Sequence, residues 1–267
     1  MIFFDAFTRF GPKANIHFAQ PYTLDQIISE MEHCSISGAL VSHTMCVQYD
    51  PMLENLRLSE SLKAYENLFP IWNIMPHWTG EFPTPVKFIE LLHKHDVRAV
   101  TIYPKTNGWD PLSRFCDSLF HTLASNGILV IIDMCSEMNE TELEKFLQYY
   151  HSLNVLLVGV SWSRQRYIIP LLIHHKNLHI AFDHFQISHG IERLVELGCA
   201  DQLIYASNAV DMSMGAHRCY VDYADVPENI KSNIASGNLS RLIKGLLPPQ
   251  EIVNGSEDSI MSQARKG

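Results

Sequence analysis

Short apolar runs alternate with amphipathic stretches along most of the chain. An apolar run of about four to eight residues predicts a buried strand, whereas apolar residues three and four positions apart predict a helix. The segment 23–36 shows the second pattern, because Leu24, Ile27 and Met31 recur at helical spacing after Thr23, whose hydroxyl can cap a helix N-terminus. The alternation predicts eight strands, each followed by a helix, with a repeat of about 30 residues, the size of a βα unit.

The predicted strands are short and mainly apolar. They lie in the segments 2–4, 38–44, 69–76, 98–105, 129–135, 154–162, 178–186 and 203–209. The predicted helices lie between them, in the segments 23–36, 50–68, 84–97, 111–128, 139–153, 167–177, 189–198 and 226–243.

Eight βα units predict an α/β fold, a (β/α)8 TIM barrel, as one domain over residues 1–248. The alternative, an open doubly wound sheet, usually has a G-x-G-x-x-G turn after its first strand, and "DAFTRFGP" lacks it. Residues 249–267 are polar and rich in Pro, Gly and Ser, and predict a loosely packed tail.

Composition narrows the classes of partner. A net charge of −9 argues against nucleic acid, which requires a concentrated basic surface. No apolar stretch reaches the roughly 18 residues of a membrane span, and the N-terminus does not have the pattern of a secretion signal. Six scattered cysteines without a C-x-x-C pair fit reduced thiols, so we expect a cytoplasmic protein without membrane or nucleic-acid partners. The sequence leaves a homo-oligomer open.

In a TIM barrel the chemistry lies at the carboxyl ends of the strands. The polar and aromatic residues predicted at these ends are Asp5, Arg9, His43, Trp72, Asn73, Tyr103, Lys105, Asp133, Ser161, Asp183, His184, Gln186 and Asn208.

Four segments resemble the amidohydrolase superfamily, in particular its amidohydrolase-related (family 2) branch. "FFDAFTRFG" is similar to the first strand of that family, and "YDPMLENLRL" to the region after its second strand. "HGIERLVELGCADQLIYASNA" resembles the segment that ends in a Gly-Ser-Asp strand, and "IASGNLSRLI" resembles the closing helix. The resemblance covers nearly all of the globular part and implies an amidohydrolase-like barrel.

The chain departs from this family at the positions that bind its metal. The two histidines of the D-x-H-x-H first strand are replaced by Phe7 and Arg9. Asp133 and Ser161 stand where the fifth and sixth strands of the family supply histidines, and Asn208 replaces the aspartate of the eighth. A catalytic zinc needs three protein donors and an open position, whereas arginine brings a permanent positive charge. We therefore expect no metal and no other cofactor, with Arg9 in place of the metal's charge.

Two residues are the catalytic candidates. Arg9 can bind a carboxylate or stabilise an oxyanion, although an ion pair with Asp5 or Asp133 would explain it equally well. Asp133 ends a strongly apolar strand and can act as a general base. The alternatives for Asp133 are a helix N-cap or a partner of Arg9.

The remaining candidates are substrate-binding residues. Lys105 can hold an anionic group with Tyr103 on the same strand face, although a solvated loop lysine is as reasonable. His43 can carry a proton or be structural, and Asn208 can hydrogen-bond a substrate. Arg166 and Gln186 complete the predicted binding set, although most loop arginines lie on the surface.

The predicted function is a metal-independent hydrolase of a small anionic lactone, ester or amide. One alternative is an inactive barrel that binds a small ligand or a partner protein. A second is a lyase, since the resembled family includes decarboxylases, which use the metal that this chain is not expected to hold.

Overall fold

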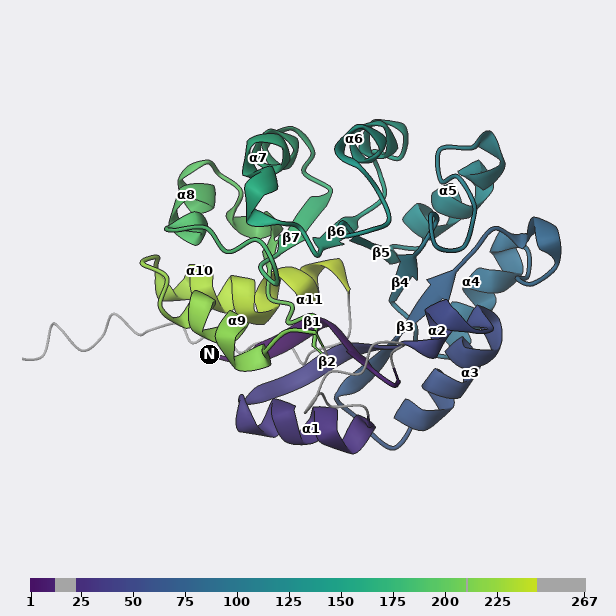
Figure 1. Cartoon of the computed structure of the whole chain (residues 1–267), viewed down its shortest axis with the longest axis horizontal. Helices are drawn as coiled ribbons and strands as arrows, with labels where there is room; N and C mark the ends of the chain where they lie inside the picture. The colour runs from purple at the N-terminus through teal and green to yellow at the C-terminus, as the bar shows by residue number, and fades with distance from the viewer. Residues whose placement is uncertain (13–22, 210, 244–267) are drawn as a thin grey trace, which may run out of the picture.

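The computed structural model describes residues 1–12, 23–209 and 211–243 of the chain. Eight strands form one sheet in the order in which they occur along the chain, and each strand pairs in parallel with the next (Figure 1). They are β1 (Phe3–Phe10), β2 (Ile36–His43), β3 (Leu68–Ile74), β4 (Ala99–Ile102), β5 (Leu129–Asp133), β6 (Val155–Val158), β7 (Leu178–Ala181) and β8 (Leu203–Ile204).

Backbone hydrogen bonds join the last strand region to the first. The N–H of Ala6 donates to the carbonyl of Tyr205 at 3.1 Å, and the N–H of Asn208 donates to the carbonyl of Phe7 at 2.9 Å. These contacts close the sheet, although regular β8 is only two residues long. The fold is a (β/α)8 TIM barrel, as the sequence predicts.

The predicted helices surround the barrel (Figure 1). They are α1 (Leu24–His33), α3 (Pro51–Leu62), α4 (Pro85–Lys94), α5 (Asp117–Ser125), α6 (Glu140–Tyr149), α7 (Gln165–His174) and α8 (Gly190–Glu196), with the last predicted helix divided into α10 (Glu228–Ser232), the π-helical η5 (Asn233–Gly237) and α11 (Asn238–Leu242). Thr23 is the N-cap of α1 as predicted, because its side chain accepts a hydrogen bond from the N–H of Gln26.

Several short elements are additional to the predicted pattern. They are α2 (Met45–Gln48), α9 (Met214–Asp222) and the 3-10 turns η1 (His77–Thr79), η2 (Arg114–Cys116), η3 (Trp162–Arg164) and η4 (Ala200–Gln202). Most of them follow a strand at its carboxyl end, where they shape the mouth of the barrel.

The interior of the barrel is filled with apolar side chains. Phe4, Leu40, Ile71, Ile131 and Leu156 belong to one buried cluster contributed mainly by the strands. A larger cluster fills the layer between the strands and the outer helices. The barrel is therefore a packed core, and polar chemistry is confined to its ends.

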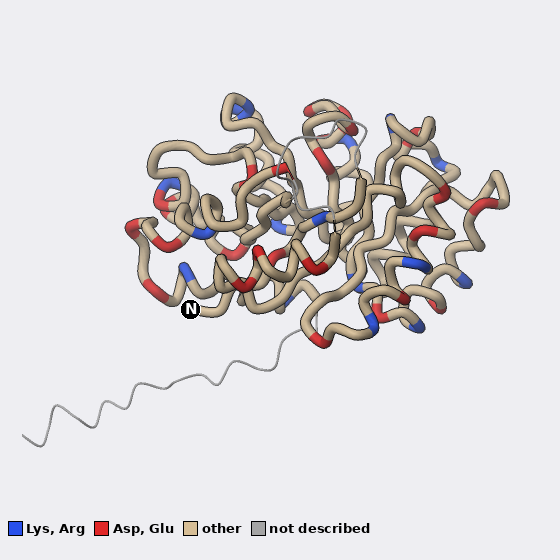
Figure 2. The backbone as a smooth tube through the Cα atoms, turned by 60° about the horizontal axis from the view of Figure 1, so that its bottom comes forward, with Lys and Arg blue, Asp and Glu red and all other residues tan. Residues whose placement is uncertain are grey.

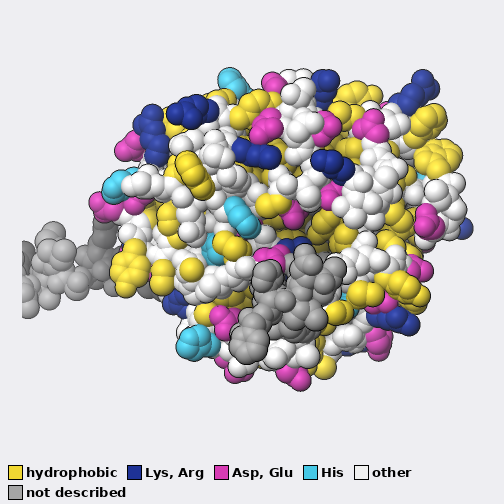
Figure 3. Space-filling view, viewed as in Figure 1, with side chains coloured by type: hydrophobic (Ala, Val, Ile, Leu, Met, Phe, Trp, Pro, Cys, Tyr) yellow, Lys and Arg dark blue, Asp and Glu magenta, His cyan; other side chains and the backbone are white. Residues whose placement is uncertain are grey.

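Lys and Arg positions are interspersed with Asp and Glu positions along the backbone (Figure 2), and side chains of both signs are scattered over the face that Figure 3 shows. Within the described ranges, no helix is long and apolar enough to cross a bilayer. The predicted boundary at 248 and the predicted tail 249–267 lie outside the described residues.

Candidate functional site

The carboxyl ends of β1, β5, β7 and the segment after β8 bring charged side chains together. Arg9 is the central one: its side chain is only 13% exposed. Its Nη2 donates to Oδ1 of Asn208 at 2.8 Å and to Oδ2 of Asp211 at 2.5 Å. The ion-pair partner of Arg9 is thus Asp211, and no ion pair joins Arg9 to Asp5 or Asp133.

Asn208 links this guanidinium to a buried acid. Its Oδ1 accepts from Arg9, and its Nδ2 donates to Oδ2 of Asp183 at 2.8 Å. These two contacts fix the orientation of the amide, since exchanging oxygen and nitrogen would remove both hydrogen bonds. The backbone of Asn208 has a positive φ of 51°, and its N–H donates a hydrogen bond to the carbonyl of Phe7, which holds the residue in place.

Asp183 lies just beyond β7, and its side chain is fully buried. Oδ2 accepts hydrogen bonds from the N–H of Gly159 at 2.7 Å and from Nδ1 of His184 at 3.0 Å, in addition to the amide of Asn208. Its other oxygen, Oδ1, is buried without a hydrogen-bond partner among the described residues. Within the described residues, Oδ2 therefore makes all three hydrogen bonds of this carboxyl group.

Asp133, the last residue of β5, lies on the other side of Gly159 from Asp183. A Cβ placed on Gly159 would come within 2.4 Å of Oδ1 of Asp133. The same oxygen accepts from the N–H of Cys135 at 2.9 Å, and the N-cap of α6 is Asn139, so Asp133 does not cap that helix. Burial raises the pKa of Asp133, although the Cys135 N–H and Arg9 act in the opposite direction.

The charge of Arg9 is maintained by its surroundings. Burial disfavours the guanidinium, but Tyr103 and the carboxylates of Asp211, Asp133 and Asp183 together raise the pKa of Arg9. Tyr103 is buried beside this group, and burial raises the pKa of its phenol to about 12. Its hydroxyl has no hydrogen-bond partner among the described residues.

Asp5 has a structural role in this arrangement. Its Oδ1 accepts from the N–H groups of Phe7 at 3.0 Å and Ser207 at 2.9 Å, and its Oδ2 accepts from the Ser207 hydroxyl. Burial raises the pKa of Asp5 to about 6. The carboxyl group therefore joins β1 to the segment after β8 beneath the polar mouth.

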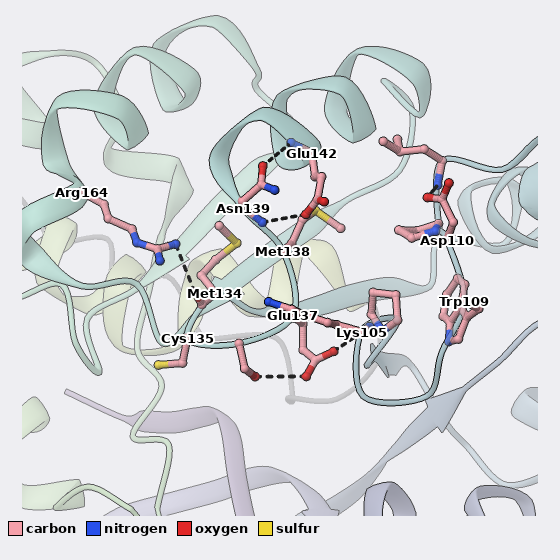
Figure 4. Close-up of a pocket in the computed structure, with 14 residues that line it drawn as sticks. Lys105, Trp109, Asp110, Met134, Cys135, Glu137, Met138, Asn139, Glu142 and Arg164 are labelled. Atoms are coloured by element: carbon pink, nitrogen blue, oxygen red, sulfur yellow. Dashed lines mark hydrogen bonds between the residues drawn. The ribbon is translucent and has the colours of Figure 1, made fainter.

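A cavity of about 330 Å³ opens beside the mouth, behind the loop that follows Asp133 (Figure 4). Lys105 and Arg164 line it, together with Met134 and Cys135. Arg164 is held by its Nη1, which donates to the Met134 carbonyl at 3.2 Å, and by an ion pair with Glu140.

Glu137 fixes the two loops that form this cavity. Its buried carboxylate accepts from the N–H groups of Lys105 and Thr106 at 3.0 and 3.1 Å, and from the Thr106 hydroxyl at 2.6 Å. The loop after β4 is thereby tied to the loop after β5, which leaves the amine of Lys105 at the cavity lining (Figure 4).

The structure gathers some predicted residues and separates others. Arg9, Asp133, Tyr103 and Asn208 share the mouth, and Lys105 lies at the adjoining cavity. The other three predicted binding residues lie elsewhere or bond locally, as follows.

His43 ends β2, where its Nδ1 accepts from the N–H of Met45 at 3.3 Å, and burial lowers its pKa. Arg166 lines an outer groove with residues of α6 and α7. Gln186 is exposed and lines a groove beside α8 and α9. Their binding roles stay predictions.

Four residues at the mouth and cavity were not among the predicted catalytic and binding residues: Asp183, His184, Asp211 and Arg164. Asp211 follows the eighth strand in a loop, and Arg164 lies in the turn η3, two positions from the predicted Arg166. Both are placed by irregular turns, which hydrophobic periodicity does not encode. Asp183 and His184 were both predicted at a strand end, but strand alternation lets only one of two adjacent residues face the pocket, so the sequence left them in competition for it.

The side chains at the mouth do not form a donor set for the metal that the resemblance implies. Phe7 offers no donor atom, and the guanidinium of Arg9 is already bonded to Oδ1 of Asn208. Across the described ranges there is no group of three or more His, Cys, Asp and Glu side chains placed to hold an ion. These side chains instead bind one another through hydrogen bonds and a salt bridge.

Comparison with known proteins shows which solved structures share the fold of this barrel. No family model and no curated protein sequence matches the chain. Solved structures do: a Staphylococcus aureus protein provisionally assigned as an amidohydrolase has a TM-score of 0.69 at 10% identity, over 91% of this chain and 99% of the other. The chain has the fold of an amidohydrolase-like barrel.

Two further amidohydrolase-like barrels carry named activities. The 2,6-dihydroxybenzoate decarboxylase from Rhizobium has a TM-score of 0.69 at 9% identity, over 91% of this chain and 98% of the other. A probable 2-pyrone-4,6-dicarboxylic acid hydrolase from Acinetobacter baumannii, with citric acid bound, has a TM-score of 0.61 at 14% identity, over 91% and 99%. TM-scores of 0.61 to 0.69 establish a shared fold, and the resemblance expected from the sequence is confirmed at the level of the fold.

Proposed function

We propose that the chain is an enzyme that hydrolyses a small anionic lactone, ester or amide without a bound metal. The observation that carries this proposal is the row Arg9–Asn208–Asp183 with Asp133 beside it. A fixed positive charge and a nearby acid are the two components that acyl transfer needs, one for the oxyanion and one for the attacking water.

Each residue has a role in this proposal. Asp133 accepts a proton from water, and Arg9 stabilises the negative charge that develops on the carbonyl oxygen. The anionic end of the substrate enters the cavity and is held by Lys105 and Arg164. Asn208 and Tyr103 orient the substrate between these positions. The bound citric acid of the Acinetobacter hydrolase supports a carboxylate-bearing substrate.

Asp133→Asn tests the catalytic role. The amide cannot accept the proton, so we expect turnover of a lactone and ester panel to fall by about 10²- to 10⁴-fold, measured as kcat/KM. Asp96→Asn is the matched control, because Asp96 is exposed at the other end of the barrel and asparagine tolerates its positive φ of 53°. Wild-type turnover should survive a chelator, and a loss of activity that a metal restores would overturn the metal-independent proposal.

A decarboxylase is the second candidate, supported by the aromatic acid decarboxylases among the structural neighbours. Burial raises the pKa of Asp133, which favours its protonated form, and a protonated carboxyl group can donate to a ring carbon as carbon dioxide leaves. Release of carbon dioxide from 2,6-dihydroxybenzoate, without ester turnover, would favour this function. Thermal stabilisation by anionic ligands without either reaction would favour a binding protein.

A further inference from the structure

Asp183, the buried end of the row that begins at Arg9, forms a dyad with His184. His184 follows Asp183 directly, its side chain is 33% exposed, and Asp183 is fully buried. A partly exposed imidazole joined to a buried carboxylate is the arrangement by which proteins orient a histidine for proton transfer.

Asp183 is held firmly enough to orient its neighbour. Its carboxylate accepts from the Gly159 N–H and from the Asn208 amide, and its backbone carbonyl accepts from Nε2 of His217 at 2.8 Å. His217 is buried in α9 and therefore fixes the chain just beyond β7.

The hydrogen bond to Asp183 determines which nitrogen of His184 can exchange a proton with a substrate. Asp183 Oδ2 already accepts two N–H donors, so Nδ1 of His184 must carry the hydrogen of the 3.0 Å bond. Nε2 is then the exchanging nitrogen, and it has no hydrogen-bond partner among the described residues. The neutral ring presents a lone pair there, and the charged ring presents an N–H.

The charges around His184 favour the protonated ring. The hydrogen bond to Asp183 is the main cause of a raised pKa, which burial opposes, and the carboxylates of Asp133 and Asp211 add to the rise. Arg9 is connected to Asp183 through the amide of Asn208, and its positive charge is paired with Asp211.

We propose that His184, oriented by Asp183, is the general acid that protonates the leaving group, with Nε2 as the donor atom. The inference rests on the proposed hydrolysis and divides the proton work between two residues. Asp133 takes a proton as the water oxygen bonds to the acyl carbon. When the bond between the acyl carbon and the leaving oxygen breaks, that oxygen takes the proton from Nε2. Exchange with water then returns a proton to His184 and removes one from Asp133.

His184→Gln tests this assignment through the leaving group. A p-nitrophenolate departs without a proton, whereas an alkoxide needs one. We therefore expect kcat/KM for an alkyl ester to fall by about 10²-fold or more, while the p-nitrophenyl ester of the same acid changes by less than about threefold. His93→Gln, a change at an exposed position of α4, should leave both values unchanged. Equal losses for the two esters would overturn the role of His184.

A second readout does not depend on turnover. NMR titration of the histidine rings, assigned by the signal missing in His184→Gln, should give His184 a pKa above its ordinary value, and Asp183→Asn should lower it. Should the wild type hydrolyse no lactone, ester or amide, the proposed function fails, whereas a His184 pKa that is the same in wild type and Asp183→Asn overturns the dyad itself.

Discussion

Gly159 is the residue on which both acids of the site depend. Its N–H binds Asp183, and its α-carbon faces Oδ1 of Asp133 so closely that a side chain would lie 2.4 Å from that oxygen and 2.8 Å from Sγ of Cys135. Its φ of +66° is also a conformation that other residues rarely adopt. Both demands select glycine here.

Gly159→Ala should therefore disturb the site more than its backbone strain alone would. Gly127→Ala is the control, because Gly127 has nearly the same φ, +65°, and no atom within 4 Å of an added Cβ. We expect the control to lose about 1 kcal/mol of unfolding free energy, and Gly159→Ala about 1–3 kcal/mol more, by urea denaturation. Equal losses would show that the close approach to Asp133 carries no cost.

At the scale of elements, the seam between β1 and the segment after β8 is held by side-chain hydrogen bonds as well as by backbone ones. Regular β8 ends at Ile204. Beyond it, Tyr205, Asn208 and Ala209 each share one backbone hydrogen bond with β1. The Asp5 carboxyl group adds bonds to the N–H and hydroxyl of Ser207 across this seam. These bonds position Asn208, the next residue, opposite Arg9.

Ser207→Ala should loosen this seam. Removing the hydroxyl leaves Oδ2 of Asp5 buried without its donor, which costs about 1–3 kcal/mol. We expect faster hydrogen exchange at the amides of Ala6 and Asn208, which bond across the seam. Ser240→Ala removes only a local bond from α11 to the carbonyl of Ser236 in η5 and should leave these amides unchanged. Exchange that is as slow in Ser207→Ala as in the control would contradict the role of the Asp5–Ser207 hydrogen bonds.

For the whole molecule, Asp5 predicts how stability depends on pH. Its pKa is raised to about 6 in the fold, against about 3.9 in an unfolded chain, so the folded protein binds this proton more tightly. The contribution is complete below about pH 4 and is lost as the pH rises through about 6. Two pKa units correspond to about 3 kcal/mol.

Asp5→Asn isolates that contribution, because Oδ1 of asparagine can still accept from Phe7 and Ser207. The unfolding free energy of the wild type minus that of Asp5→Asn should decrease by about 3 kcal/mol from pH 4 to pH 7, because the other acids cancel in the difference. A difference that stays constant over this range would show that Asp5 titrates as it does in the unfolded chain.

The sequence predicts the barrel because its pattern is local and repeated. Strands and helices follow from periods of two and 3.6 residues, and Asp133, Asp183 and Asn208 follow from the position of strand ends. Helix α9 was missed although Met214, His217 and Val221 form its buried face, because a histidine interrupts the apolar stripe. The contacts of Asp211 and Arg164 depend on irregular turns, so only the structure reveals them.

The guanidinium of Arg9 has a consequence for the conditions in which such a site works. A positive charge carried by the polypeptide is present as soon as the chain has folded, and it needs neither uptake nor delivery. Under the proposed metal-independent mechanism, an organism that makes this protein would keep the site in working order however scarce trace elements became.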